Sequence, residues 1–373
     1  MSEPVHGLPP HLAPHVAAET NYYALPEALQ LQHGGSLADV TIAYQTWGDA
    51  ERASKTVLIC HALTGSADVD AWWPGVIGAE GAFDPAEDFI ICSNILGSCY
   101  GTTGPASPLP DGAGRYRGRF PRITVRDMVE AQRLLLDHLD VTTIDLITGP
   151  SLGGMQALEW ALSYPERVKS IVPIGVGGRH SPWCIAGSEA QRNAIYADPN
   201  WNGGDYEDES PPNAGLSAAR MMAVCTYRSW DSFEARFGRD KRDDGQFQVQ
   251  SYLQHQGAKI TQRFDANTYV RLTQAMNDHD VSVGRGGYEE TLQLIVQPAL
   301  VVSVSSDGLY PPAEQVLLAE QLPNARYEIL DSIHGHDGFL IESAVLAAKI
   351  RGFRDSLDGR ETADGARVSA ANG

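Results

Sequence analysis

A serine with a glycine two positions away on either side is the residue of this 373-residue chain best suited to act as a nucleophile. Ser151 stands in the sequence GPSLG at 149–153, between an apolar run at 144–148 and a helix-like stretch at 155–162. A strand, a sharp turn and a helix in this order expose a serine hydroxyl at the end of a sheet. The pattern predicts acyl chemistry at Ser151, although an isolated match is more simply a helix N-cap serine.

A catalytic serine needs a histidine base and usually a carboxylate that fixes the imidazole tautomer. After a turn of this kind, the acid and then the histidine follow the serine along the chain. Asp307 follows an apolar run at 300–304, which places it at the carboxyl end of an expected strand, where α/β proteins bind ligands. Taken alone, it would be a turn or N-cap aspartate before the helix expected near Pro311. With the serine and a downstream histidine present, we favour Asp307 as the catalytic acid.

Two histidines lie in one loop after the last expected strand. The strand is 325–330 and the loop is 332–337 (SIHGHD), so His334 and His336 both reach the same edge of the sheet as the acid. Sequence order alone leaves the choice of base open. The alternative for this loop is a metal cluster, but no HxxEH motif or second His/Cys cluster completes a metal-binding set, so we expect no metal.

The oxyanion formed by nucleophilic attack requires two N–H donors that are already in position. The N–H of Leu152, which follows the serine, is the first expected donor. Residues 61–65 (HALTG) follow an expected strand at 57–60, and this places the N–H of Leu63 as the second donor. For the side chain of His61 we expect a structural role, in which hydrogen bonds hold the turn.

Short, continuous apolar runs recur along the chain, as in strands that are buried on both faces of a sheet. Helical periodicity at 128–136 indicates crossovers between parallel strands. The fold class is therefore α/β with a mainly parallel sheet. An antiparallel hairpin at the sheet edge is expected from 29–32 and 40–44 around the turn 33–36. The expected buried strands are 57–60, 89–92, 146–147, 171–174 and 300–304.

This alternation of strands and helices stops between about 177 and 293. Segments such as 218–224 and 247–253 there have helical character, with no strands between them, which predicts a helical lid inserted into the sheet domain. Both ends of the chain lack periodicity. The predicted division is a mobile N-terminus over 1–20, a first core part over 21–176, the lid over 177–293, a second core part over 294–356 and a disordered tail over 357–373.

Composition narrows the class of protein. Charged residues make up 20% and hydrophobic residues 43%, as in ordinary globular proteins. The formal net charge of -19 argues against a nucleic-acid surface and against anionic membranes. Neither a secretion signal nor a membrane-spanning run is expected, and cysteines that lack CxxC spacing suit a reducing cytoplasm. The cysteines are Cys60, Cys92, Cys99, Cys184 and Cys225.

Long motifs around these residues resemble the homoserine O-acetyltransferase family of α/β-hydrolase-fold enzymes. The resemblance extends from about residue 24 to 355, and several motifs in order are far more specific than one GxSxG. It implies an α/β-hydrolase fold with an inserted helical lid, Ser151 as nucleophile, and Asp307 and His336 as its relay, and so it selects His336 over His334. The motifs are HALTG at 61–65, NILGSC at 94–99, GTTGP at 101–105, SLGGMQALEW at 151–160, LQHQG at 253–257 and GHDGFL at 335–340.

The resemblance also implies how an amino-acid substrate is held. Arg228 would meet the homoserine carboxylate and Asp337 its amino group, which leaves the side-chain hydroxyl free to react. Without the resemblance, a surface ion pair would be preferred for Arg228. Leu309 stands where succinyl-transferring relatives carry an arginine, so the resemblance points to an acetyl donor.

A group of five arginines could attract the negatively charged phosphates of CoA. A solvated loop paired with the many acidic residues is the favoured alternative. The group comprises Arg115, Arg117, Arg119, Arg122 and Arg126.

The predicted function is homoserine O-acetyltransferase of methionine biosynthesis. Acetyl-CoA would acetylate Ser151, and L-homoserine would then take the acetyl group, with no bound cofactor. The resemblance further implies a homodimer. The chain departs from the family pattern at Pro150 and Leu152, which flank the serine, without loss of the Leu152 N–H. The alternatives are an O-succinyltransferase, an acetyltransferase for serine or another alcohol, and an esterase or thioesterase.

Overall fold

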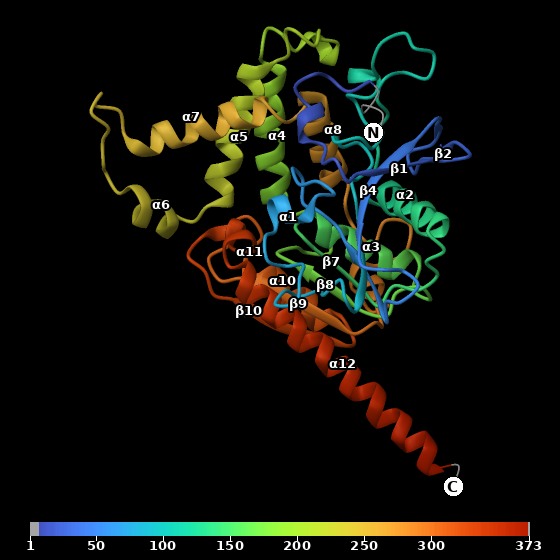
Figure 1. The fold of residues 1–373 in the computed structure, drawn as a ribbon. Helices are drawn as coiled ribbons and strands as arrows, with labels where there is room; N and C mark the ends of the chain where they lie inside the picture. The colour runs from blue at the N-terminus through green and yellow to red at the C-terminus, as the bar shows by residue number, and fades with distance from the viewer. Residues whose placement is uncertain (1–6, 372–373) are drawn as a thin grey trace.

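An eight-stranded sheet forms the centre of the computed structural model, which describes residues 7–371, with side chains to residue 359 (Figure 1). The strands are β1 (Asn21–Ala24), β4 (Thr41–Trp47), β5 (Lys55–Ile59), β6 (Asp88–Ser93), β7 (Leu146–Pro150), β8 (Ile171–Ile174), β9 (Ala299–Val304) and β10 (Ala325–Leu330). Their order across the sheet is β1-β4-β6-β5-β7-β8-β9-β10. Strands β5 to β10 pair in parallel, while β4 is antiparallel to both β1 and β6. The expected α/β class with a mainly parallel sheet is confirmed, as are the expected apolar strands.

Side chains of the central strands alternate between two hydrophobic cores. In β5, Leu58 belongs to the core that includes residues of α2 (Val125–His138) and α3 (Leu152–Ser163). Val57 and Ile59 belong to the opposite core, with residues of α12 (Ser343–Ala371). Each fully buried aliphatic side chain of this size contributes about 1.5–3 kcal/mol to folding. Because both faces are covered, these strands contain continuous apolar runs rather than apolar residues at alternate positions only.

The predicted hairpin at the sheet edge was wrong in its pairing. Strand β2 (Leu29–Gln30) pairs with β3 (Ser36–Leu37) in a separate two-stranded sheet. Strand β4 pairs instead with β1 on one side and β6 on the other. Gly34 and Gly35, both with positive φ, close the short β2–β3 turn. The longer β4 buries its side chains by joining the main sheet, which local alternation did not reveal.

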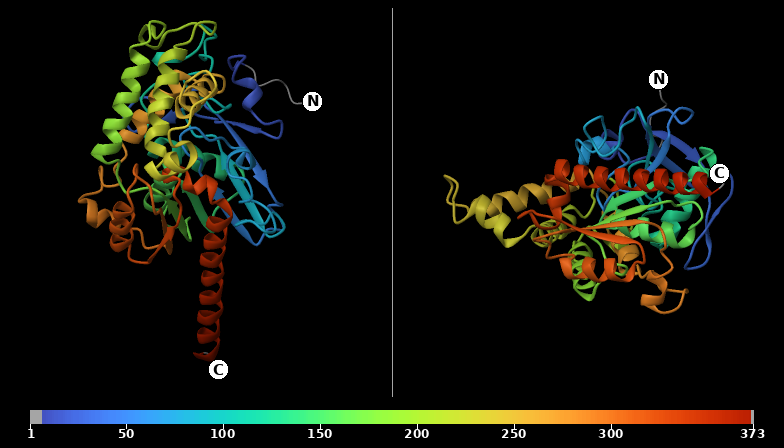
Figure 2. Two further views of the ribbon diagram at one scale, coloured as in Figure 1. Left: turned by 90° about the vertical axis from the view of Figure 1, so that its left-hand side faces the viewer. Right: turned by 90° about the horizontal axis from the view of Figure 1, so that it is seen from below.

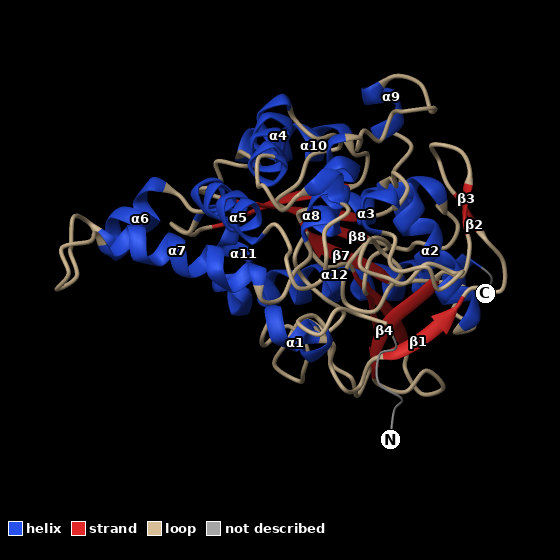
Figure 3. Cartoon of the chain, turned by 90° about the horizontal axis from the view of Figure 1, so that it is seen from above, coloured by secondary structure: helices blue, strands red, loops and turns tan. Residues whose placement is uncertain are grey.

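The interval 177–293 holds helices, most of them over the carboxyl ends of the strands, as expected for a lid (Figure 3). They are α4 (Pro182–Tyr196), α5 (Asn213–Tyr227), α6 (Trp230–Phe237), α7 (Gln248–Thr261), α8 (Ala266–Asn277) and α9 (Tyr288–Leu292). Helices α6 and α7 project to one side as an arm (Figure 3).

The chain leaves and re-enters the sheet domain through a narrow neck, at residues 178–181 and 278–281. Arg179 and Asp280 form an antiparallel bridge there, and the N–H of Val281 donates to the carbonyl of Gly178 at 3.0 Å. Helix α9 follows the second segment of this neck. The segment enclosed by the neck therefore ends before α9, whereas the predicted lid interval includes it.

The predicted terminal segments, 1–20 and 357–373, extend beyond the described residues at both ends. The first six residues lie outside the described part, but Leu12 is fully buried in the core. Helix α12 continues to Ala371, where we expected a disordered tail over 357–373, and it projects from the rest of the molecule (Figure 2). No proline interrupts this segment, and each internal glycine costs a helix only about 1 kcal/mol. Within residues 7–371, no helix combines the length and apolar character that crossing a membrane requires.

Candidate active site

Ser151 occupies a strained turn between β7 and α3. Its φ is 54° and its ψ is -121°, which costs a residue other than glycine roughly 1–3 kcal/mol. A Cβ atom at Gly149 or Gly153 would lie 2.2 or 2.0 Å from the carbonyl oxygen of Cys60. Both glycines are therefore required for the close approach of the turn to β5. The N–H of Ser151 donates to the carbonyl of Ile174 at 2.9 Å, which fixes the turn to β8.

Asp307 and His336 form a buried pair at the same edge of the sheet. Oδ2 of Asp307 lies 2.6 Å from Nδ1 of His336, and Oδ1 accepts the N–H groups of Leu309 and Tyr310 at 2.8 and 2.9 Å. Burial by itself lowers the pKa of His336, but the carboxylate of Asp307 outweighs it, so the pKa is raised above its ordinary value. The carboxylate is thus held in one orientation, and it favours a protonated imidazole.

Of the two histidines in the loop, His336 contacts Asp307. His334 instead places Nδ1 3.1 Å from the hydroxyl of Ser232 in α6. Gly335, with φ of 66°, separates them, and a Cβ atom there would lie 2.5 Å from the carbonyl oxygen of Tyr227. The close passage of the loop beneath α5 therefore directs the two imidazoles to different partners.

Ser151 and His336 line one cavity of about 160 Å³ between the sheet and the lid. Nε2 of His336 is buried and has no hydrogen-bond partner among the residues that the structure describes. This nitrogen is therefore free to accept a proton from a hydroxyl group in the cavity. The lining residues are Ala62, Leu63, Thr64, Gly65, Trp72, Ser151, Arg220, Tyr227, Arg263, His336, Asp337, Phe339 and Leu340.

The two expected oxyanion donors lie on the two turns that border this cavity. Leu152 is the first residue of α3, and Leu63 lines the cavity from the turn after β5. His61 holds that turn, because its Nδ1 donates to the carbonyl of Ala62 at 2.8 Å and its Nε2 accepts the N–H of Ile95 at 3.1 Å. Burial lowers the pKa of His61 to about 4, so the imidazole stays neutral and can accept this bond.

The motifs at 94–99 and 101–105 hold the loop after β5 in place through hydrogen bonds. Asn94 accepts the N–H of Ala67 at 2.8 Å and donates to the carbonyl of Tyr100 at 2.8 Å. The hydroxyl of Thr102 donates to the carbonyl of Asn94 at 2.7 Å and accepts the N–H of Ala43 at 2.9 Å. These bonds join the loop after β5 to β4 and β6, so the motif residues are positional supports.

Arg228, the basic residue expected at the substrate, contacts Asp337 at the edge of the cavity, while two other arginines line the cavity itself. Arg228 places Nε 3.0 Å from Oδ2 of Asp337, so the two residues expected at opposite ends of the substrate pair with each other. Among the described residues, those that line the cavity include Arg220 and Arg263 but not Arg228. Arg220 lies seven residues before Tyr227, which is two helical turns, and its guanidinium lies 5.4 Å from the centre of that ring. The sequence analysis missed Arg220, and helical spacing from Tyr227 is the signal that could have identified it.

Leu309 contacts the Asp307–His336 pair through its backbone N–H rather than through its side chain. Its N–H binds Asp307, and its side chain packs against the hydrophobic core. In the described part of the chain, Leu309 is not among the residues that line the cavity. The structure therefore gives no contact through which its side chain would select an acyl group.

Four of the five arginines in the cluster pair with acidic residues, which agrees with the favoured alternative of a loop paired with acids. Arg119 donates to the carbonyl of Arg115 at 2.8 Å. The ion pairs are Arg115 with Asp208 at 2.9 Å, Arg117 with Glu207 at 3.3 Å, Arg122 with Asp278 at 2.5 Å and Arg126 with Glu159 at 2.8 Å.

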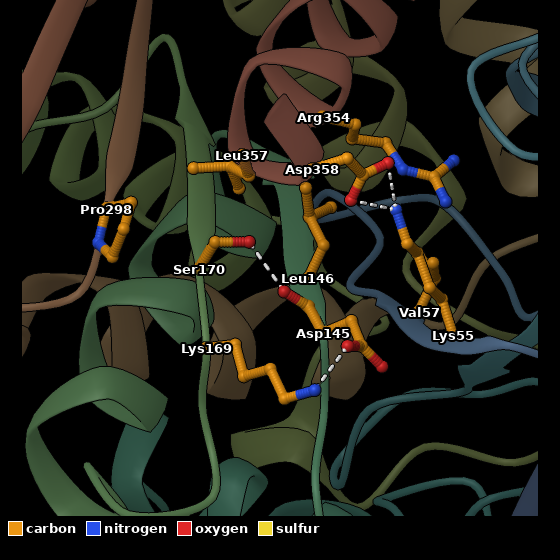
Figure 4. A pocket seen from close by; sticks show the side chains of 10 residues that line it. All are labelled: Lys55, Val57, Asp145, Leu146, Lys169, Ser170, Pro298, Arg354, Leu357 and Asp358. Atoms are coloured by element: carbon orange, nitrogen blue, oxygen red, sulfur yellow. Dashed lines mark hydrogen bonds and ion pairs between the residues drawn. The ribbon is translucent and has the colours of Figure 1, made fainter. Parts of the chain in front are cut away.

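A second cavity lies at the amino ends of the strands, beneath α12 (Figure 4). Lys55 at the start of β5 pairs with Asp358 of α12 at 2.5 Å, and the hydroxyl of Ser170 donates to the carbonyl of Asp145 at 2.5 Å. The described residues that line it include no histidine or cysteine. Among the described residues, the lining of this cavity therefore lacks the histidine base that the Ser151 cavity contains.

Comparison with known proteins agrees with this geometry. The family model of the alpha/beta hydrolase fold matches residues 55–342. A homoserine O-acetyltransferase of Trichormus variabilis is 57% identical over 345 residues, which cover 92% of this chain and 96% of that protein. The solved structure of homoserine O-acetyltransferase from Bacillus anthracis has a TM-score of 0.82 at 24% identity, covering 90% of this chain and 96% of that one. The structure of esterase E22 also has a TM-score of 0.82 at 24% identity, covering 90% and 99%.

Proposed function

The chain belongs to the homoserine O-acetyltransferase family, which has the α/β-hydrolase fold, and from this we propose that it transfers the acetyl group of acetyl-CoA to the hydroxyl of L-homoserine. The product is O-acetyl-L-homoserine, an intermediate for methionine synthesis. Sequence identity of 57% across 92% of the chain carries this proposal. The buried pair of Asp307 and His336 beside Ser151 supplies the chemistry that the reaction needs.

The first half of the reaction acetylates Ser151. His336 takes the serine proton on Nε2, and the serine oxygen attacks the carbonyl carbon of the thioester. The N–H groups of Leu63 and Leu152 stabilise the oxyanion of the tetrahedral intermediate. As the intermediate collapses, the carbon–sulfur bond breaks, and His336 returns the proton to the departing CoA thiolate. Acetyl-CoA is thus a co-substrate that leaves as CoA before the second substrate reacts.

The second half transfers the acetyl group to homoserine. Its hydroxyl gives a proton to Nε2 of His336 and attacks the carbonyl carbon of acetyl-Ser151, and the serine oxygen recovers the proton as it leaves. The Asp307 carboxylate stabilises the imidazolium in both halves, in keeping with the raised pKa of His336. The kinetics are therefore of the ping-pong type.

We assign the contact with the homoserine carboxylate to Arg220, in place of Arg228. Arg220 and Asp337 both line the cavity, so a guanidinium and a carboxylate can hold the two charged ends of a zwitterion. Arg228 supports this arrangement through its ion pair with Asp337 at 3.0 Å. The side-chain hydroxyl of homoserine then points to the acyl group.

Hydrolysis is the rival activity, since an esterase of the same fold has a TM-score of 0.82 to this chain. The test supplies acetyl-CoA or succinyl-CoA with homoserine, serine or no acceptor, and measures CoA release and the mass of the product. We expect a burst of about one CoA per active site without acceptor, and steady turnover with acetyl-CoA and homoserine. Fast steady turnover without acceptor would identify a hydrolase, and preference for succinyl-CoA or serine would identify another acyltransferase.

We also propose a homodimer in the cytoplasm. The projecting α6–α7 arm offers a surface for a second copy, with Trp230 74% exposed at its base. Light scattering should give twice the chain mass of 40.3 kDa. Four of the five free cysteines are buried, which suits a reducing compartment.

A further inference from the structure

A tyrosine next to the proposed triad contacts both its acid and its base. The backbone N–H of Tyr310 donates to Oδ1 of Asp307 at 2.9 Å. Its ring lies against that of His336, with 5.2 Å between ring centres and 33° between ring planes. The side chain of Tyr310 is fully buried. The orientation of this one residue therefore constrains both members of the Asp307–His336 pair.

The hydroxyl of Tyr310 is anchored outside the triad. It lies 3.0 Å from Nδ1 of His180. Burial, together with nearby His279 and Arg192, lowers the pKa of His180 to about 3. Burial also raises the pKa of Tyr310 well above its ordinary value. The imidazole is therefore neutral and the phenol protonated, so the hydroxyl donates and Nδ1 accepts.

His180 is itself fixed by the lid neck in which it lies. Its N–H donates to the carbonyl of His279 at 2.9 Å, and the adjacent Arg179 forms an antiparallel bridge with Asp280. These are the residues at which the chain leaves and re-enters the sheet domain. The hydrogen bond from Tyr310 to His180 thus connects the lid neck to the turn that carries Asp307.

We propose that Tyr310 is a positioning residue for acyl transfer and that His180 anchors it, so that the geometry of Asp307 and His336 depends on a contact from the lid neck. This inference rests on the proposed function, in which the pair activates Ser151. Removing the Tyr310 hydroxyl keeps its ring and its N–H but frees the turn at 307–310 to relax. The expected loss is about five- to tenfold in rate, the effect of one buried hydrogen bond.

The test compares Tyr310→Phe with Tyr327→Phe. The hydroxyl of Tyr327 lies 2.7 Å from Oγ of Ser303, so the control removes a hydroxyl contact of the same kind on the sheet. We expect Tyr310→Phe to lower kcat about five- to tenfold and to leave KM for homoserine unchanged. It should also move the acid limb of the pH profile to lower pH, because a looser carboxylate raises the pKa of His336 less. Tyr327→Phe should lower Tm without either kinetic change.

If Tyr310→Phe does not fold, a second pair of variants at His180 tests whether the hydrogen bond to Tyr310 affects the rate. His180→Asn keeps an acceptor near the position of Nδ1, whereas His180→Leu removes it, so kcat should fall with leucine and recover with asparagine. Wild-type kcat and an unshifted pH profile in His180→Leu would overturn the inference, as would equal losses in the two variants. A wild-type enzyme that forms no acetyl-Ser151 would instead contradict the proposed function.

Discussion

Nδ1 of His336 lies 2.6 Å from Oδ2 of Asp307, and both side chains are buried. The other carboxylate oxygen accepts two backbone N–H groups, so Asp307 has no second orientation available without breaking these bonds. The imidazole consequently keeps its Nε2 side free in the cavity that Ser151 also lines. Because the proposed base is held in this way, we expect the activity to depend on substitutions at Ser151, Asp307 and His336.

Replacing Ser151 should remove the acyl carrier without disturbing the fold. We expect Ser151→Ala to lower the rate of acetyl transfer by at least about a thousandfold. Intact-protein mass spectrometry should detect no acetyl group on the variant after exposure to acetyl-CoA. Ser170→Ala is the matched control, because that hydroxyl binds the carbonyl of Asp145 at the other end of the sheet. Homoserine acetylation by Ser151→Ala at the wild-type rate would rule out the covalent mechanism.

The rate should rise with pH through the pKa of His336, because the imidazole must be neutral to take the serine proton. Burial lowers this pKa and Asp307 more than offsets the effect, so the midpoint should lie above 6.5. Asp307→Asn removes the carboxylate, so the midpoint should move to lower pH and the maximal rate should fall by about 10⁴-fold. Profiles of kcat/KM between about pH 5 and pH 9 measure both effects. A midpoint that stays in place in Asp307→Asn would mean that another group titrates.

The close approach of Gly153 to β5 should make this position intolerant of any side chain. A Cβ atom there would lie 2.0 Å from the carbonyl oxygen of Cys60, a contact with rigid backbone. We expect Gly153→Ala to destabilise the protein by about 3 kcal/mol or more. Gly352→Ala in α12 is the control, since a Cβ atom there has no neighbour within 4 Å and should stabilise the helix by about 0.5–1 kcal/mol. Urea unfolding measures both, and equal effects would contradict the steric argument.

Substrate binding should depend more on Arg220 than on Arg228. Arg220→Met removes a charge-assisted contact to the homoserine carboxylate, so we expect KM for homoserine to rise about tenfold or more. The burst of CoA release without homoserine should be unchanged, because acetylation of Ser151 does not use that contact. Arg228→Met removes the ion pair with Asp337 and should have a smaller effect on KM. A larger rise in KM for Arg228→Met would restore the assignment that the family resemblance implied.

The sequence predicted the sheet and the serine turn because these features are local. Continuous apolar runs mark strands that are covered on both faces, and each expected run is a strand in the structure. The glycines around Ser151 signal a tight turn, and the order of Asp307 and the histidine loop follows the order of the strand ends. Local alternation did not reveal that β4 pairs with β1 and β6, because pairing depends on which partner buries the whole strand.

Patterns in the amino-acid sequence were thus enough to predict the fold class, the turn at Ser151 and the loops that carry its partners. The family resemblance had already selected His336 over His334, and the tertiary structure shows the contacts that each side chain makes. His336 contacts Asp307 while His334 contacts the lid, and Arg220 lines the cavity while Arg228 pairs with Asp337. The physical reason is that backbone patterns depend on near neighbours, whereas the direction of a side chain depends on the packing of segments far apart in the chain.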